Sequence, residues 1–216
     1  MDIVLIHGMG RTPFSMLRLR RQLRRAGHTP ILFGYSPTFE SLQGATARLV
    51  RLIERRVDSD AYALVGHSLG AVLIRASLGR LQRRPPAACF FLSPPMRVCK
   101  AARFFSRFWV YKILTGEMGQ LLANDAFMQQ LPMPPAFTRI YAGTRGPRAR
   151  WLPLGTEPND LILSVSEATG DYPQFAVEVP AIHAFIMHSK LVYDDMIRSL
   201  ATIEPPARPN PPCGQA

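Results

Sequence analysis

The sequence predicts an α/β protein, in which a mainly parallel sheet carries helices on both of its faces. Two observations lead to this fold class. Short apolar runs without polar alternation recur along the chain, as in strands that are buried on both faces. Segments with apolar residues at helical spacing separate these runs, and strands that alternate with helices favour a parallel sheet.

The expected elements follow in chain order. Thr12 as N-cap, Pro13 at the first position and Gly27 as a stop bound the first helix. We expect strands at residues 2–6, 30–34, 61–65, 87–92, 137–143 and 174–179. We expect helices at residues 13–26, 39–57, after Ser68, and 189–200. Residues 1–203 are read as a single domain, and the proline-rich residues 204–216 as a disordered tail.

Residues 97–131 differ from the rest of the chain and predict a small helical, cap-like insertion. They are rich in aromatic residues, among them Phe104, Phe105, Phe108 and Trp109, and a second short helix is expected near residues 118–128. Two interpretations stay open: the insertion supplies an apolar acyl pocket, or its aromatics only pack on the sheet. A membrane contact is a weaker third interpretation.

The charge of the chain is unevenly distributed. The net charge is +11, and residues 1–84 hold 14 Arg against 5 acidic residues. Much of the excess lies on two expected amphipathic helices, whose apolar positions Leu17, Leu19, Leu23, Leu49, Leu52 and Ile53 should face a core. Two solvated basic faces are the default explanation, with weak contact to an anionic membrane surface as the alternative. We expect no nucleic-acid binding, because no aromatic interleaving accompanies the arginines.

Composition limits the remaining classes. The three cysteines follow no metal-ligand spacing and imply no disulfide framework, so we expect no metal site. The chain starts directly with a strand and contains no apolar stretch of membrane-spanning length, which together favour a cytoplasmic protein.

The motif Gly66-His67-Ser68-Leu69-Gly70 lies between the expected strand 61–65 and a helix. Such a turn raises a serine hydroxyl above the edge of a sheet, and it requires small neighbours because its backbone is strained and closely packed. The following helix points its first N–H groups at the serine. Ser68 is therefore the candidate nucleophile.

A serine hydroxyl needs a general base, and the base needs a partner that fixes its tautomer. His183 follows the last expected strand and should emerge at the same edge as Ser68, and Asp160 lies in the preceding loop. His188 and Asp171 are the competing residues; we prefer the first pair because His188 falls at the closing helix and Asp171 at a turn beside a glycine.

An oxyanion hole should accompany this constellation. The backbone N–H of Leu69 is one expected donor, since it opens the helix after Ser68. The loop His7-Gly8-Met9-Gly10 directly follows the first strand, and the N–H of Met9 is the second expected donor.

These motifs, in this order, resemble small α/β-hydrolases of the lipase and esterase group, especially compact bacterial lipase-like proteins. The resemblance also includes Asn159-Asp160 ahead of Val165-Ser166, and His183-Ala184-Phe185-Ile186-Met187. It implies an α/β-hydrolase fold with Ser68, Asp160 and His183 as catalytic triad and Met9 and Leu69 at the oxyanion hole. Related sequences often read Asn-Asp-Gly-x-Val, whereas here Leu161-Ile162-Leu163 replaces the glycine-containing turn.

The expected function is hydrolysis of a small-molecule or lipid-like carboxylic ester through an acyl-enzyme on Ser68, a reaction for which we expect no cofactor. The alternative is a catalytically weak module of the same fold that binds an anionic membrane surface or a protein partner, which the charge of residues 1–84 favours.

Overall fold

The computed structural model describes residues 1–98, 109–152 and 154–203 of the chain. The expectation of a disordered tail at residues 204–216 lies outside the described residues, as do the side chains of Phe104, Phe105, Phe108 and Trp109.

Six strands form one sheet in the described part of the chain, and every neighbouring pair is parallel. The strand order is β2-β1-β3-β4-β5-β6. The strands are β1 (Asp2–Ile6), β2 (Thr29–Phe33), β3 (Tyr62–His67), β4 (Ala88–Leu92), β5 (Phe137–Gly143) and β6 (Ala176–Val179). The predicted α/β class is confirmed, and each predicted strand is present within a few residues of its expected bounds.

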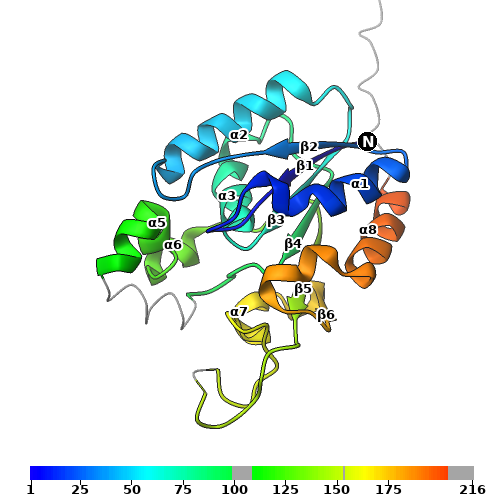
Figure 1. Cartoon of the computed structure of the whole chain (residues 1–216). Helices are drawn as coiled ribbons and strands as arrows, with labels where there is room; N and C mark the ends of the chain where they lie inside the picture. The colour runs from blue at the N-terminus through cyan, green and yellow to red at the C-terminus, as the bar shows by residue number, and fades with distance from the viewer. Residues whose placement is uncertain (99–108, 153, 204–216) are drawn as a thin grey trace, which may run out of the picture.

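Helices cover both faces of this sheet (Figure 1). On one face, side chains of α1 (Leu17–Arg25) and α8 (Lys190–Thr202) pack in a core with every second residue of β1, β3 and β4. On the other face, α2 (Leu42–Arg56) and α3 (Leu69–Ser77) pack on the remaining strand residues. Shorter elements are η1 (Pro13–Met16), η2 (Leu78–Arg80), α7 (Val165–Thr169), η3 (Pro173–Phe175) and η4 (His183–His188).

The described part of the insertion forms α5 (Trp109–Leu121) and α6 (Asp125–Gln130). Gly116 has a φ of 56° and interrupts α5; a Cβ there would lie 2.7 Å from the carbonyl oxygen of Thr38, so this kink packs against the loop after β2. Met128 and Leu131 are buried in the same core as α2 and α3. This part of the insertion therefore packs on the body of the protein.

Two details of the helices differ from the sequence-based expectation. The first predicted helix begins as the 3-10 turn η1, and the side chain of Thr12 at its N-cap makes no capping hydrogen bond. Leu17 is 40% exposed, although we expected it to face the core. The buried stripe of this segment is Met16, Leu19 and Leu23, and a residue one step along a helix is rotated by about 100° out of such a stripe.

The parallel register sets the position of the candidate site. His67 at the end of β3 pairs with Leu92 at the end of β4, and Leu92 pairs with Tyr141 near the end of β5. The loops that follow β1, β3, β5 and β6 consequently meet at one edge of the sheet, where parallel α/β proteins build their binding sites.

Candidate active site

Ser68 occupies a sharp turn between β3 and α3. Its φ of 50° and ψ of −117° are unusual for a residue other than glycine, and a strained backbone of this kind costs about 1–3 kcal/mol. A Cβ at Gly66 would lie 2.5 Å from the nitrogen of Ala71, and one at Gly70 would lie 2.5 Å from the carbonyl oxygen of Ile6. The two glycines therefore permit the close packing that holds this turn.

Asp160 and His183 form a hydrogen-bonded pair at the same edge of the sheet. The Nδ1–H of His183 donates to Oδ2 of Asp160 at 2.7 Å, and the side chains are 13% and 2% exposed. A carboxylate on Nδ1 fixes the imidazole tautomer and leaves Nε2 free to accept a proton. The two residues that we predicted from chain order are thus in contact.

The carboxylate of Asp160 is held by its own loop. Its Oδ1 accepts hydrogen bonds from the backbone N–H of Ile162 at 3.0 Å and of Leu163 at 2.7 Å. Burial raises the pKa of the Asp160 carboxyl, but the hydrogen bonds from His183 and Leu163 lower it more, so the pKa lies below its ordinary value. Asp160 is therefore ionised at neutral pH.

Leu161 has a left-handed backbone conformation at the point where this loop differs from the related sequences. Its φ is 87°, a left-handed conformation that favours glycine, and its side chain is half exposed. Related sequences often have a glycine in this turn. The loop thus keeps the turn that positions Asp160 although leucine stands there.

Three hydrogen bonds tie the His183 segment to three other segments of the chain. The backbone N–H of His183 donates to the carbonyl oxygen of Asp160 at 2.8 Å. Nε2 of His67 donates to the carbonyl oxygen of His183 at 3.0 Å, and the guanidinium of Arg11 donates to that of Ala184 at 2.8 Å. Sequence reasoning missed His67 and Arg11 as residues that position His183, because their partners are backbone atoms distant in sequence.

His67 is neutral in the folded protein. It is buried, and its Nδ1 has no hydrogen-bond partner among the described residues. Burial, together with the neighbouring His183 ring at 5.1 Å, lowers the pKa of His67 from 6.5 to about 3. A neutral ring with its proton on Nε2 is the form that donates to the His183 carbonyl.

The loop after β1 is fixed against the turn at Ser68. Nε2 of His7 accepts the N–H of Tyr35 at 3.4 Å, so its Nδ1–H donates to the carbonyl oxygen of Gly8 at 2.9 Å. A Cβ at Gly8 would lie 3.1 Å from the Cβ of Ser68. Within the described residues, the N–H groups of Met9 and Leu69 donate to no acceptor.

The geometry distinguishes the competing residues. Asp171 forms an ion pair with Arg97, and its side chain is 72% exposed. The ring of His188 lies near that of Phe185, at 5.9 Å.

In the described part of the chain, no hydrogen bond joins the Ser68 hydroxyl to His183; the two residues are linked through His67, which precedes Ser68 and donates to the His183 backbone.

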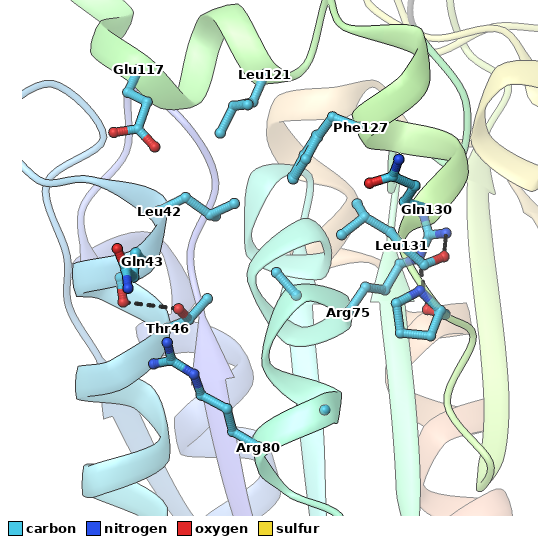
Figure 2. A pocket seen from close by; sticks show the side chains of 13 residues that line it. Leu42, Gln43, Thr46, Arg75, Arg80, Glu117, Leu121, Phe127, Gln130 and Leu131 are labelled. Atoms are coloured by element: carbon cyan, nitrogen blue, oxygen red, sulfur yellow. Dashed lines mark hydrogen bonds between the residues drawn. The ribbon is translucent and has the colours of Figure 1, made fainter.

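A hollow of about 550 Å³ lies between α2, α3 and the insertion. Figure 2 shows Leu42 and Thr46 on one side of it and Phe127 and Leu131 on the other. Arg75 belongs to its lining and donates to the carbonyl oxygens of Leu131 and Pro132, which ties α3 to the end of α6. Among the described residues, those that line the hollow do not include the candidate catalytic ones.

Comparison with known proteins agrees with this edge-of-sheet arrangement. The sequence profile of the Alpha/beta hydrolase family matches residues 3–209. The chain belongs to this family. The resemblance drawn from its motifs is thereby confirmed. A comparison with curated protein sequences finds no match.

Several solved structures share the fold of this α/β-hydrolase family member at low sequence identity. The mature lipase BlEst2 of Bacillus licheniformis has a TM-score of 0.68 at 17% identity, over 92% of this chain and 91% of the lipase. The ydeN gene product of B. subtilis has a TM-score of 0.63 at 17% identity, over 93% and 98% of the two chains. The thioesterase RedJ of Streptomyces coelicolor, from prodiginine biosynthesis, has a TM-score of 0.58 at 14% identity, over 94% and 90%.

The described residues offer neither a cluster of metal-binding side chains nor a membrane-spanning helix. No group of three or more His, Cys, Asp or Glu side chains is arranged there to hold a metal ion. No helix in the described ranges is long and apolar enough to cross a bilayer.

Proposed function

We propose that this family member is a serine hydrolase that cleaves a carboxylic ester. In this proposal Ser68 is the nucleophile, His183 the general base and acid, and Asp160 the residue that orients His183. The backbone N–H groups of Met9 and Leu69 bind the oxyanion.

The reaction proceeds through an acyl-enzyme. Oγ of Ser68 attacks the ester carbonyl carbon while Nε2 of His183 takes the hydroxyl proton, and the oxyanion that forms is stabilised by the two N–H groups. The tetrahedral intermediate breaks its bond to the alkoxide, which receives the proton from His183. Water then attacks the acyl carbon while His183 accepts a proton from it. The second tetrahedral intermediate breaks its bond to Oγ of Ser68, which takes that proton back from His183, and the carboxylic acid leaves.

One observation carries the proposal: a buried carboxylate bonded at 2.7 Å to Nδ1 of a histidine at the sheet edge that also holds a strained serine. The Asp160 carboxylate would stabilise the imidazolium that forms when His183 takes the proton. The N–H groups of Met9 and Leu69, which have no acceptor within the described residues, suit a site where negative charge develops.

The first test is labelling with a fluorophosphonate probe and mapping of the modified residue by mass spectrometry. We expect labelling at Ser68 that His183→Ala abolishes. His188→Ala and Asp171→Asn are matched controls, because each replaces a competing residue of the same type. Absence of labelling on a folded protein would refute the proposal, as would dependence on His188 in place of His183.

A second test separates ester from thioester substrates. Ester hydrolysis is proposed because the profile family and a lipase of the same fold agree with it, while a thioesterase shares that fold as well. We expect the kcat/KM for a p-nitrophenyl acyl ester to depend on Ser68. A strong preference for the matching acyl thioester would keep the mechanism and overturn the substrate class.

The alternative, a catalytically weak binding module, has a distinct signature. A folded protein that binds vesicles or a partner, and that neither labels nor hydrolyses any acyl ester or thioester, would favour it.

A further inference from the structure

Two chain segments next to His183 expose large apolar side chains. Phe14 of η1 and Leu17 of α1 are 75% and 40% exposed, and Phe185 of η4 and Leu191 of α8 are 53% and 39% exposed. Exposed apolar side chains that gather on one surface, unlike single ones, mark a site of interaction. These four residues are called the apolar face below.

The two segments lie beside each other. The guanidinium of Arg11, just before η1, donates to the carbonyl oxygen of Ala184, just before Phe185. Farther along, the hydroxyl of Tyr193 in α8 approaches the carbonyl oxygen of Gln22 in α1 at 3.4 Å, and α1 contacts both η4 and α8. Figure 1 shows α1 and α8 on the same side of the sheet. The apolar face thus adjoins the segment that carries His183.

A purely cationic surface continues from this face along α1. The helix contains five arginines and no carboxylate. Leu17, Arg18, Arg21, Arg24 and Arg25 are exposed and recur at helical spacing, opposite the buried Leu19 and Leu23. A shallow hollow of about 430 Å³ lies among Leu17 and four of the arginines.

Helix α8, which contacts α1, does not neutralise this charge. Its acidic residues Asp194 and Asp195 are paired, the first with Lys190 and the second with Arg139 and Arg198. Within the described residues, no arginine of α1 forms an ion pair. The cationic stripe is therefore available to an anionic partner.

We propose that the apolar face and the α1 arginines together form a docking surface for anionic lipid membranes. The apolar side chains would enter the acyl boundary, and the arginines would contact lipid phosphates. A bilayer has an apolar layer next to a layer of anionic phosphates, which matches a surface where the apolar face adjoins the α1 arginines. The proposal goes beyond hydrolysis, since binding needs no catalytic residue, and it would bring lipid-like esters close to His183.

The charge contribution is tested by flotation with vesicles of phosphatidylcholine alone or mixed with phosphatidylglycerol, using the full chain with Ser68→Ala to prevent turnover. The triple variant Arg18→Glu, Arg21→Glu, Arg25→Glu reverses the α1 stripe. The matched control is Arg51→Glu, Arg55→Glu, Arg56→Glu, which makes the same charge change on exposed residues of α2, on the opposite face of the sheet.

We expect binding to the anionic vesicles only. Each lipid-facing arginine contributes about fivefold to partitioning, so loss of three arginines weakens binding on the order of 100-fold, and the three glutamates add repulsion. We therefore expect the α1 variant to bind at least about 100-fold more weakly, and the α2 variant to bind within a few fold of the parent. Equal weakening by the two variants would attribute binding to net charge and overturn the proposal. Equal binding to both kinds of vesicle, or binding to neither, would also overturn it.

The apolar contribution is tested with Phe14→Ser combined with Phe185→Ser. Phe39→Ser combined with Trp151→Ser is the control, because these aromatics are exposed but lie outside the apolar face. We expect at least a tenfold loss of vesicle binding for the first pair only, and an equal loss for both pairs would contradict the proposal.

Folding and partner type are checked in parallel. The α1 and α2 variants carrying native Ser68 should retain fluorophosphonate labelling, which would show that they are folded. A parent protein that binds vesicles without being labelled would count against the proposed hydrolase but not against the docking surface. Should labelling be silent for that reason, the thermal unfolding midpoint of each variant replaces it as the folding check. Polyglutamate binding that the α1 variant removes, without vesicle binding, would replace the lipid assignment by an acidic protein partner.

Discussion

Replacing His67 by glutamine should remove much of the acid sensitivity of the fold. The folded protein keeps His67 neutral, with a pKa of about 3, whereas an unfolded histidine has a pKa near 6.5. The unfolded state therefore binds more protons between these two values, and the free energy of unfolding falls as the pH falls through that window. The amide N–H of glutamine can still donate to the carbonyl oxygen of His183.

The magnitude follows from the unfolded pKa alone, since folded His67 stays neutral at pH 5.0. Protonation of the unfolded chain between pH 7.5 and pH 5.0 should cost the parent protein about 2 kcal/mol through this residue. Burial also lowers the pKa of His7 and His28, and their contributions have the same sign. Both residues are present in the variant, so the difference between the two proteins isolates His67.

The assay is urea unfolding of both proteins at pH 7.5 and pH 5.0, followed by circular dichroism. We expect the parent to lose about 2 kcal/mol more than His67→Gln between the two pH values. A difference below about 0.5 kcal/mol would refute the assignment of His67 as a buried, neutral donor.

Three further predictions concern the loops of the site. Leu161→Gly should be more stable than Leu161→Ala by about 1 kcal/mol, reversing the usual order because φ is 87°, and a thermal midpoint that is equal or higher for the alanine variant would contradict this. Asp160→Asn should reduce the kcat for ester hydrolysis about 10³–10⁴-fold through loss of the histidine tautomer, with Asp171→Asn near the parent; similar rates for the two variants would reject the role of Asp160. Gly8→Ala places a Cβ 2.7 Å from Nδ1 of His67 and should lower the free energy of unfolding by about 1–3 kcal/mol and also lower kcat. Gly79→Ala, whose Cβ meets nothing within 4 Å, should change neither quantity; if unfolding and kinetic assays gave the same result for both variants, the close approach at Gly8 would be unimportant.

The buried strands were predictable because a parallel sheet covered on both faces needs continuous apolar runs, which are visible in the sequence without any knowledge of neighbours. The turn at Ser68 was predictable for a similar reason. Only small residues tolerate the contacts that Gly66 and Gly70 make, so the motif carries its own geometry. Leu17 shows the limit of such reasoning, since its periodicity alone did not reveal that the helix turns it outward.

The pairing of Asp160 with His183 followed from chain order, because loops after parallel strands meet at one edge. The residues that hold His183 could not be found in this way. His67 and Arg11 act through backbone carbonyl groups, which every residue possesses and which leave no mark in the sequence.

The sequence by itself determined the sheet, the strained turn and the order of the candidate catalytic residues, since these depend on local side-chain size and apolar pattern. Only the tertiary structure decided that leucine occupies a left-handed position beside Asp160, that His67 is neutral and donates to His183, and that the apolar face adjoins an unpaired arginine stripe. Each of these depends on which distant segments come into contact, and packing between such segments fixes burial, and with it the charge state and the hydrogen-bond partners of a side chain.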